Sequence, residues 1–158
     1  MMHHTSHILE SADRIAAQGS TADCLRELRR LSLDEFALVM YGMPDQRYPG
    51  LSAALPAMAS VDVQRQWTGA DGIELLKQRV PFLEKLRRHF LEITGRRLEG
   101  AQILDYGCGY GLMLRLMYYF SDPARLVGCD PWERSIRLCE EAGIGCRNSH
   151  NSRVRASW

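Results

Sequence analysis

The stretch ILDYGCGYG, residues 103–111, decides the fold that the sequence predicts. In it, a short apolar run with an acid near its end meets a cluster of glycines, Gly107, Gly109 and Gly111. Glycines in a strand-to-helix turn allow positive φ and let a ligand lie directly on the backbone. The run LMLRLMYYF that follows is apolar on nearly all sides, which predicts a helix covered on two sides. The stretch therefore predicts a strand, a glycine-rich turn and a helix.

A second short apolar run, RLVGCD at residues 125–130, lies downstream and again ends in an acid, Asp130. Pro131 follows at the favoured first position of a helix, and Asp130 is suited to cap that helix. The order strand, turn, helix, strand, helix is that of a right-handed βαβ unit with the next helix. Residues 99–144 are therefore predicted to start a parallel sheet in an α/β fold, as a partial Rossmann-like domain.

The spacing of the glycines separates two classes of cofactor. Dinucleotide-binding turns have the pattern G-x-G-x-x-G, and its third glycine would fall on Leu112. The pattern here is G-x-G-x-G, and Asp105 stands just ahead of the first glycine. A carboxylate beside the cofactor attracts a cation and repels a pyrophosphate. Because S-adenosylmethionine carries an ammonium and a sulfonium and no phosphate, the electrostatics favour this methyl donor over NAD.

ILDYGCGYG followed by RLVGCD resembles motif I and the second-strand acid of the class I S-adenosylmethionine-dependent methyltransferases. The resemblance covers about residues 100–144. It implies a transferase that binds S-adenosyl-L-methionine and methylates a small molecule by in-line displacement at the sulfonium carbon. The cofactor-binding residues that it implies are Asp105, Gly107, Cys108, Gly109, Gly111, Asp130 and Trp132. The catalytic residues stay unknown at this stage.

Residues 1–98 are predicted to form a helical extension. Ser32 and Glu35 have the spacing of a capping box, in which each residue bonds to the backbone of the other. A later helix is predicted to end at Gly95, with Pro81 kinking or dividing it. By analogy with many small-molecule methyltransferases, the extension looks like a lid on the substrate side.

The individual roles follow from the resemblance, position by position. Asp105 would lie near the methionine amino group, and Asp130 would bind the ribose hydroxyls. The three glycines would line methionine and ribose, with Cys108 as a small residue among them, and Trp132 would lie near adenine. Alternative interpretations stay open for Asp130 as a helix cap, for Trp132 as a core residue, and for Trp67 as either a substrate-pocket roof or a buried anchor.

The segment GCRNSHNSRVRASW at residues 145–158 changes composition abruptly, with three arginines and no acid. The family expects an apolar third strand here, whereas this composition predicts an irregular, disordered tail, foreign to the ancestral sequence as after a frameshift. The domain is then expected to be truncated, with an open sheet edge that favours self-association. The short chain is expected not to catalyse methylation.

The composition excludes several other classes. The formal net charge of +1 gives no reason to expect a nucleic-acid partner, and no apolar stretch is long enough for a membrane. The five cysteines are odd in number and lack C-x-x-C spacing, which predicts reduced thiols in a cytoplasmic protein and no metal site. A non-catalytic S-adenosylmethionine-binding or partner-binding fragment is the main alternative. A dinucleotide oxidoreductase fragment is disfavoured by Asp105 and Leu112.

Overall fold

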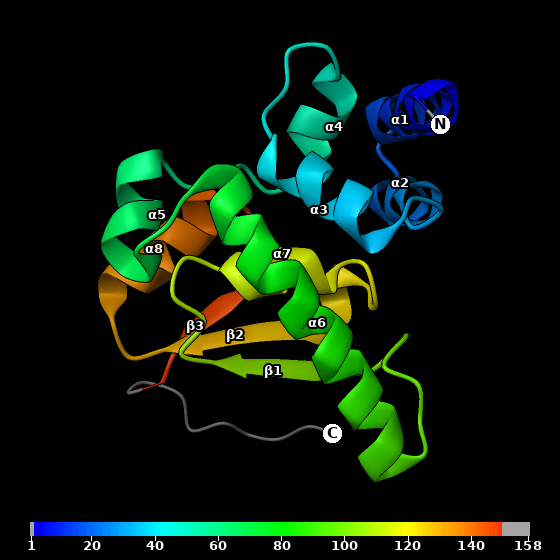
Figure 1. The fold of residues 1–158 in the computed structure, drawn as a ribbon. Helices are drawn as coiled ribbons and strands as arrows, with labels where there is room; N and C mark the ends of the chain where they lie inside the picture. The colour runs from blue at the N-terminus through cyan, green and yellow to red at the C-terminus, as the bar shows by residue number, and fades with distance from the viewer. Residues whose placement is uncertain (1, 150–158) are drawn as a thin grey trace.

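The computed structural model describes residues 2–149 and combines helices with one small parallel sheet (Figure 1). The elements before the sheet are helices: α1 Met2–Ala17, α2 Thr21–Leu28, α3 Leu33–Tyr41, α4 Pro49–Ala54, α5 Val61–Thr68 and α6 Gly72–Thr94. The sheet region consists of β1 Ile103–Tyr106, α7 Leu112–Met117, the 3-10 helix η1 Pro123–Arg125, β2 Leu126–Asp130, α8 Glu133–Glu141 and β3 Cys146–Asn148. The predicted α/β class and the helical first half are confirmed.

The three strands are parallel and lie in the order β1-β2-β3. Asp105 pairs in register with Gly128, and Gly128 pairs with Cys146. Side chains at these paired positions point to the same face of the sheet. Because the strands are parallel, their carboxyl ends meet at one edge, where Tyr106 leads into the glycine-rich loop and Asp130 ends β2.

The third strand corrects the sequence analysis, which predicted an irregular segment at this point. The backbone N–H of Gly128 donates to the carbonyl of Gly145 over 2.9 Å and opens the β2–β3 ladder. The hydrogen bonds of a parallel ladder join backbone groups, so a short polar segment can pair with β2. Ile144, which is 4% exposed, anchors this segment in the core. The rest of the predicted tail, residues 150–158, lies outside the described residues.

The two faces of the sheet differ. The helices α7 and α8 lie on the same face (Figure 1), because the two crossovers follow one another in the same direction across the sheet. On the opposite face, the side chains of Leu104 and Tyr106 are 54% and 74% exposed. The covered face therefore holds most of the buried groups of the sheet region, although Cys129 of β2, which pairs with Tyr106, is also buried.

The helix ends follow local sequence signals. The Ser32–Glu35 capping box is present: the N–H of Glu35 donates to Ser32 Oγ over 3.2 Å, and the N–H of Ser32 donates to Glu35 Oε2 over 3.0 Å. α6 ends at Gly95, which adopts a φ of 66°. Pro81 does not divide α6, because side chains on both sides of it are buried in the core and hold the two halves in place.

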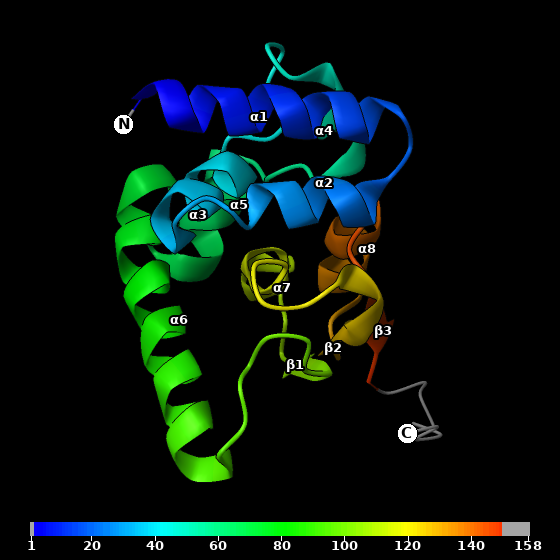
Figure 2. The same ribbon diagram turned by 90° about the vertical axis from the view of Figure 1, so that its right-hand side faces the viewer.

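The helices pack tightly on one another and on the sheet region. α1 lies along α2 (Figure 2) and also contacts α4, while α3 contacts α6 and α7. Gly50 lets α4 approach α1, since a Cβ there would lie only 2.3 Å from the carbonyl oxygen of Asp13. One apolar cluster runs from Leu25 and Phe36 in the helices to Leu126 in β2, so both regions share a core. Within residues 2–149, no helix has the length and apolar character of a membrane span.

Candidate cofactor site

The candidate site lies where β1 ends and the chain turns into α7. Gly107, Gly109 and Gly111 adopt φ values of 78°, 56° and 74°, a region that other residues rarely enter. The glycine spacing predicted this turn, and here it produces three left-handed positions within one short loop. Between them, the side chains of Cys108 and Tyr110 are buried. The loop therefore presents backbone on one side and is anchored by side chains on the other.

Two carboxylates flank this loop at the ends of neighbouring strands. Asp130, only 7% exposed, accepts through Oδ2 from the N–H of Gly109 over 3.0 Å and through Oδ1 from the N–H of Trp132 over 2.9 Å. Asp130 was predicted to cap a helix starting at Pro131, but α8 starts at Glu133 with Trp132 as its N-cap. Pro131 and Trp132 form the turn between β2 and α8, so no helix starts directly after Asp130. The Asp130 carboxylate instead connects the glycine-rich loop to this turn.

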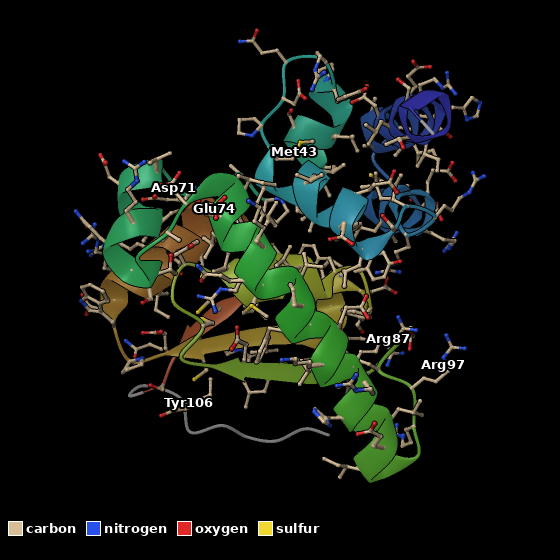
Figure 3. The ribbon with its side chains drawn as sticks, viewed as in Figure 1. Met43, Asp71, Glu74, Arg87, Arg97 and Tyr106 are labelled. Carbon is tan, nitrogen blue, oxygen red and sulfur yellow. The ribbon has the colours of Figure 1, made fainter. Side chains whose placement is uncertain are left out.

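Asp105, in β1, is the second carboxylate. Its Oδ2 atom is buried and has no hydrogen-bond partner among the described residues. Burial raises the pKa of Asp105, and the negative charge of Asp130 raises it further. An ionised carboxylate in this position lacks a donor or a cation, which an incoming ligand could supply. The next residue, Tyr106, points away from this group to the open face of the sheet (Figure 3).

The helical extension reaches the loop through Trp67 of α5. The indole ring lies 3.4 Å from the position that a Cβ on Gly109 would occupy. It stacks on Trp132, with ring centroids 4.9 Å apart and an interplanar angle of 21°, and Arg134 lies 5.7 Å from both rings. An open hollow of about 410 Å³ lies against the pair and is also lined by Gln66. Trp67 thus covers part of the loop, a contact between elements far apart in the sequence.

The three glycines have different surroundings. A Cβ at Gly107 would meet no atom of the described residues within 4 Å, so this backbone is open toward them. A Cβ at Gly111 would lie 2.6 Å from Ile144 Cδ1 and 3.3 Å from Cys139 Sγ. Gly111 therefore allows close packing of α7 on the β3 side of the domain, a role that the spacing alone did not reveal.

Of the seven residues predicted to bind a cofactor, five lie together at the carboxyl edge of the sheet: Asp105, Gly107, Gly109, Asp130 and Trp132. The remaining two, Cys108 and Gly111, are buried under α8 and β3. Trp132 is 52% exposed, so it is not the core residue of the alternative interpretation.

Sequence reasoning missed Arg115, which lies in the stripe of α7 that was assigned to core packing. Its side chain is fully buried. Its guanidinium donates to the carbonyls of Ala57 at 2.9 Å, Tyr110 at 3.2 Å and Gly111 at 3.3 Å. Burial lowers its pKa. Arg115 thus links the end of the glycine-rich loop to the segment before α5. A charged residue in an otherwise apolar helix was the sequence feature that could have indicated this role.

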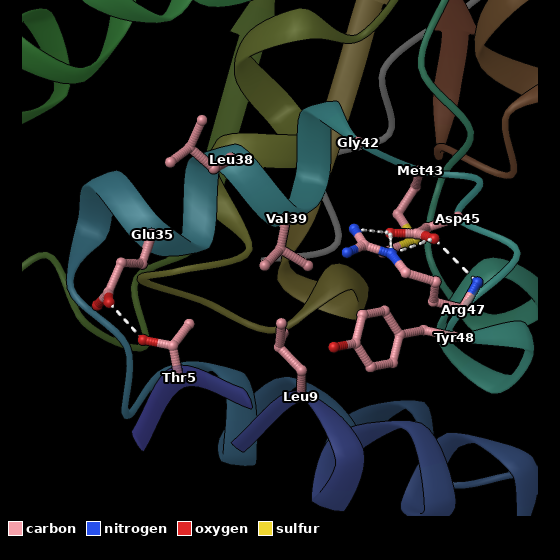
Figure 4. Close-up of a pocket in the computed structure, with 10 residues that line it drawn as sticks. All are labelled: Thr5, Leu9, Glu35, Leu38, Val39, Gly42, Met43, Asp45, Arg47 and Tyr48. Atoms are coloured by element: carbon pink, nitrogen blue, oxygen red, sulfur yellow. Dashed lines mark hydrogen bonds and ion pairs between the residues drawn. The ribbon is translucent and has the colours of Figure 1, made fainter. Parts of the chain in front are cut away.

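A separate pocket lies between α1, α3 and the segment before α4 (Figure 4) and has a volume of about 230 Å³. Its polar groups bond to one another: Thr5 Oγ1 donates to Glu35 Oε1 over 2.7 Å, and Arg47 pairs with Asp45 at 2.7 Å. Most of its other lining side chains are apolar. This pocket has neither the glycines nor the flanking carboxylates of the loop, so the loop is the stronger candidate.

Comparisons of the chain with models of protein families, with curated proteins and with solved structures find no match. The geometry of the chain's own residues therefore carries the functional inference. That geometry offers an open glycine backbone, two carboxylates on adjacent strands and a half-exposed tryptophan. Together these groups can bind a ligand that is cationic at one end and aromatic at the other.

Proposed function

We propose that the glycine-rich loop binds S-adenosylmethionine and that the chain belongs to a Rossmann-like methyltransferase of the class I type. The observation that carries the proposal is the pair of carboxylates, Asp105 and Asp130, at the ends of adjacent parallel strands. One oxygen of Asp105 is buried and has no hydrogen-bond partner within residues 2–149. A ligand ammonium would satisfy that oxygen with a charge-assisted hydrogen bond.

The remaining groups fit the rest of the ligand. Each carboxylate oxygen can accept two hydrogen bonds, so Asp130 keeps capacity for ribose hydroxyls beside its bonds to Gly109 and Trp132. The half-exposed indole of Trp132, which stacks on Trp67, suits contact with an adenine ring. When bound, S-adenosylmethionine supplies an electrophilic methyl group, and the chain's residues bind and orient it. The acceptor, which we propose to be a small molecule, would approach from the side of the helical extension.

The topology also supports the proposal. The order β1-β2-β3, with both crossover helices on one face, is that of one half of a doubly wound sheet. In such sheets, ligands bind outside the carboxyl ends of the strands. The candidate loop lies at that edge, directly after β1.

A dinucleotide is the weaker candidate for the same loop. A pyrophosphate near Asp105 and Asp130 would be repelled by two carboxylates. Leu112, 6% exposed, occupies the position where the dinucleotide pattern has its third glycine. Both observations favour a cationic ligand over NAD.

The second candidate function is a non-catalytic S-adenosylmethionine-binding module. Trp67 favours it, because its ring already lies over Gly109 and restricts the space above the loop. Methyl transfer from a labelled donor separates the two candidates. Transfer above the level of an Asp105→Ala control supports the enzyme, whereas binding without transfer to a panel of small acceptors supports the module.

Calorimetric titration with S-adenosylmethionine, S-adenosylhomocysteine and NAD tests the ligand itself. We expect both adenosyl ligands to bind more tightly than NAD. Replacing Asp130 with alanine should weaken them by about 1–3 kcal/mol, since charge-assisted bonds to the ribose are lost. The exposed Asp62 of α5 provides a matched control, and Asp62→Ala should bind like the parent chain. Tighter binding of NAD would refute the proposal.

A further inference from the structure

Three cysteines from separate elements meet beneath the glycine-rich loop. Cys108 lies in the loop, Cys139 in α8 and Cys146 in β3, and their sulfur atoms all lie within 4.8 Å of one another. The sulfurs of Cys108 and Cys146 are 3.1 Å apart. Sequence spacing predicted no metal site, because no two cysteines form a C-x-x-C pair. The fold nevertheless brings three thiols to one point.

We propose that this cluster binds one thiophilic d10 metal ion, zinc(II) or copper(I), through three thiolates. Zinc–sulfur bonds are about 2.3 Å long, so three sulfurs around one ion lie about 4 Å apart. The three sulfur atoms of the cluster all lie within 4.8 Å of one another, which is compatible with that separation. Soft thiolate ligands select zinc and copper(I) over magnesium or calcium. The site does not depend on the proposed cofactor, because none of its ligand atoms belongs to the two carboxylates.

Two glycines make room for the sulfur atoms. A Cβ at Gly128 of β2 would lie 2.8 Å from Cys108 Sγ, and a Cβ at Gly111 would lie 3.3 Å from Cys139 Sγ. Larger residues at either position would push into the cluster. Cys146 is only half-buried, so the cluster is partly accessible to solvent on the side of β3.

Binding an ion would exchange protons for metal. Burial raises the pKa of Cys146 to about 12, and the Cys108 thiol also has a raised pKa, mainly through its hydrogen bond with Cys139 and through burial. The thiols of Cys108 and Cys146 therefore keep their protons near neutral pH. On binding, three S–H bonds break, three metal–sulfur bonds form, and the protons leave to the solvent. Zinc(II) then leaves the trio with one net negative charge, and copper(I) leaves it with two.

An ion here would fix three elements to one another. The Cys108 ligand lies between Gly107 and Gly109, so the metal would hold the candidate cofactor loop against α8 and β3. β3 is a short edge strand, and a metal bond at Cys146 would secure it to the rest of the sheet. We therefore expect metal to raise the melting temperature of the chain.

The test uses the full chain, freed of metal and reduced with a non-thiol reductant. Cobalt(II) serves as the optical probe, because thiolate ligation gives an intense charge-transfer absorption, and zinc(II) should displace it at one equivalent. A separate competition with a coloured copper(I) chelator measures copper(I). The Cys139→Ala and Cys146→Ala variants should bind about 100-fold more weakly or worse. Cys24→Ala, which removes a buried cysteine of α2 outside the cluster, should bind like the parent chain.

X-ray absorption on the metal-loaded parent chain keeps the test independent of variant folding. We expect a shell of three sulfur neighbours at about 2.3 Å from zinc. A shell of nitrogen and oxygen alone would overturn the proposal. So would the absence of stoichiometric binding by zinc, cobalt and copper(I), or equal binding by the Cys139→Ala variant.

Discussion

The helical region up to Gly95 and the sheet region from β1 to β3 bury different kinds of groups. In the helical region, the fully buried side chains include Leu25, Leu28, Phe36 and Met40, which are apolar. In the sheet region, a carboxylate, a guanidinium and thiols are buried among apolar side chains, and most of these polar groups bond to backbone groups of the loop. Both regions share apolar packing, and the sheet region adds specific polar geometry to it.

The largest expected effect lies in the helical region. Phe36 is fully buried and contacts Tyr119 edge-on, with ring centroids 5.2 Å apart. Phe36→Ala should lower the free energy of unfolding by about 3–5 kcal/mol, measured by denaturant titration. Leu38 on the same helix is 50% exposed, and Leu38→Ala should cost less than about 1 kcal/mol. Equal losses for the two variants would contradict the assignment of the core.

The next effect lies in the loop, where Gly111 combines a positive φ with close packing. Gly111→Ala should cost about 2–4 kcal/mol, because strain adds to overpacking against Ile144. Gly143 has a similar φ of 73°, but no atom of residues 2–149 lies within 4 Å of its Cβ position, so Gly143→Ala should cost only about 1–2 kcal/mol. Thermal unfolding of both variants measures the difference. Equal losses of stability in the two variants would mean that Gly111 is not closely packed against Ile144.

Much of the fold could be predicted from sequence where local signals decide the outcome. The Ser32–Glu35 box and Gly95 act on neighbouring backbone groups, so the helix ends they predict are present. The strand at Cys146–Asn148 could not be predicted, because it depends on backbone pairing with β2 rather than on its own side chains. A strand of three residues also leaves no readable alternation.

A pH-dependent prediction concerns Asp105, whose pKa is raised by burial and by Asp130. A raised folded-state pKa means that the stability contribution of the group is complete below its ordinary value of 3.8 and is lost as pH rises through the folded value. Asp105→Asn, which cannot ionise, should therefore melt at a higher temperature than the parent chain at about pH 7. This advantage should shrink as the pH falls toward 3.8.

Melting curves across that pH range, recorded without ligand, measure the effect. Asp62→Asn, at an exposed position of α5, is the matched control and should track the parent chain. An Asp105→Asn variant that is less stable than the parent at neutral pH would show that the carboxylate has a stabilising partner.

The smallest expected effect concerns a bond that joins the two regions. Tyr119 donates its hydroxyl to the carbonyl of Leu31 over 3.0 Å. Tyr119→Phe should therefore cost about 0.5–1.5 kcal/mol in denaturant titrations. The hydroxyl of Tyr41 is buried and has no hydrogen-bond partner in the described part of the chain, so Tyr41→Phe should be neutral or stabilising. A larger loss of stability in Tyr41→Phe than in Tyr119→Phe would contradict this bonding pattern.

The candidate site could be predicted only in part. The local pattern of apolar runs predicts where strands end, and candidate site residues are expected at those ends. This pattern pointed to Asp105, Gly107 and Asp130. Two other contacts join segments that are far apart in the chain: Trp67 packs over Gly109, and Arg115 bonds to Ala57. No local sequence pattern predicts such contacts. The thiol cluster was missed for the same reason.

We propose that Asp105 binds the amino group of S-adenosylmethionine while Asp130 binds its ribose. The most direct test compares two ligands, S-adenosylmethionine and 5′-methylthioadenosine, which is a neutral thioether without the 3-amino-3-carboxypropyl chain. Each is titrated into the parent chain and into the Asp105→Asn and Asp130→Ala variants. We predict that Asp105→Asn weakens S-adenosylmethionine about tenfold and leaves 5′-methylthioadenosine unchanged, whereas Asp130→Ala weakens both. If the parent chain binds neither ligand, or both variants bind both ligands like the parent, the claim is contradicted.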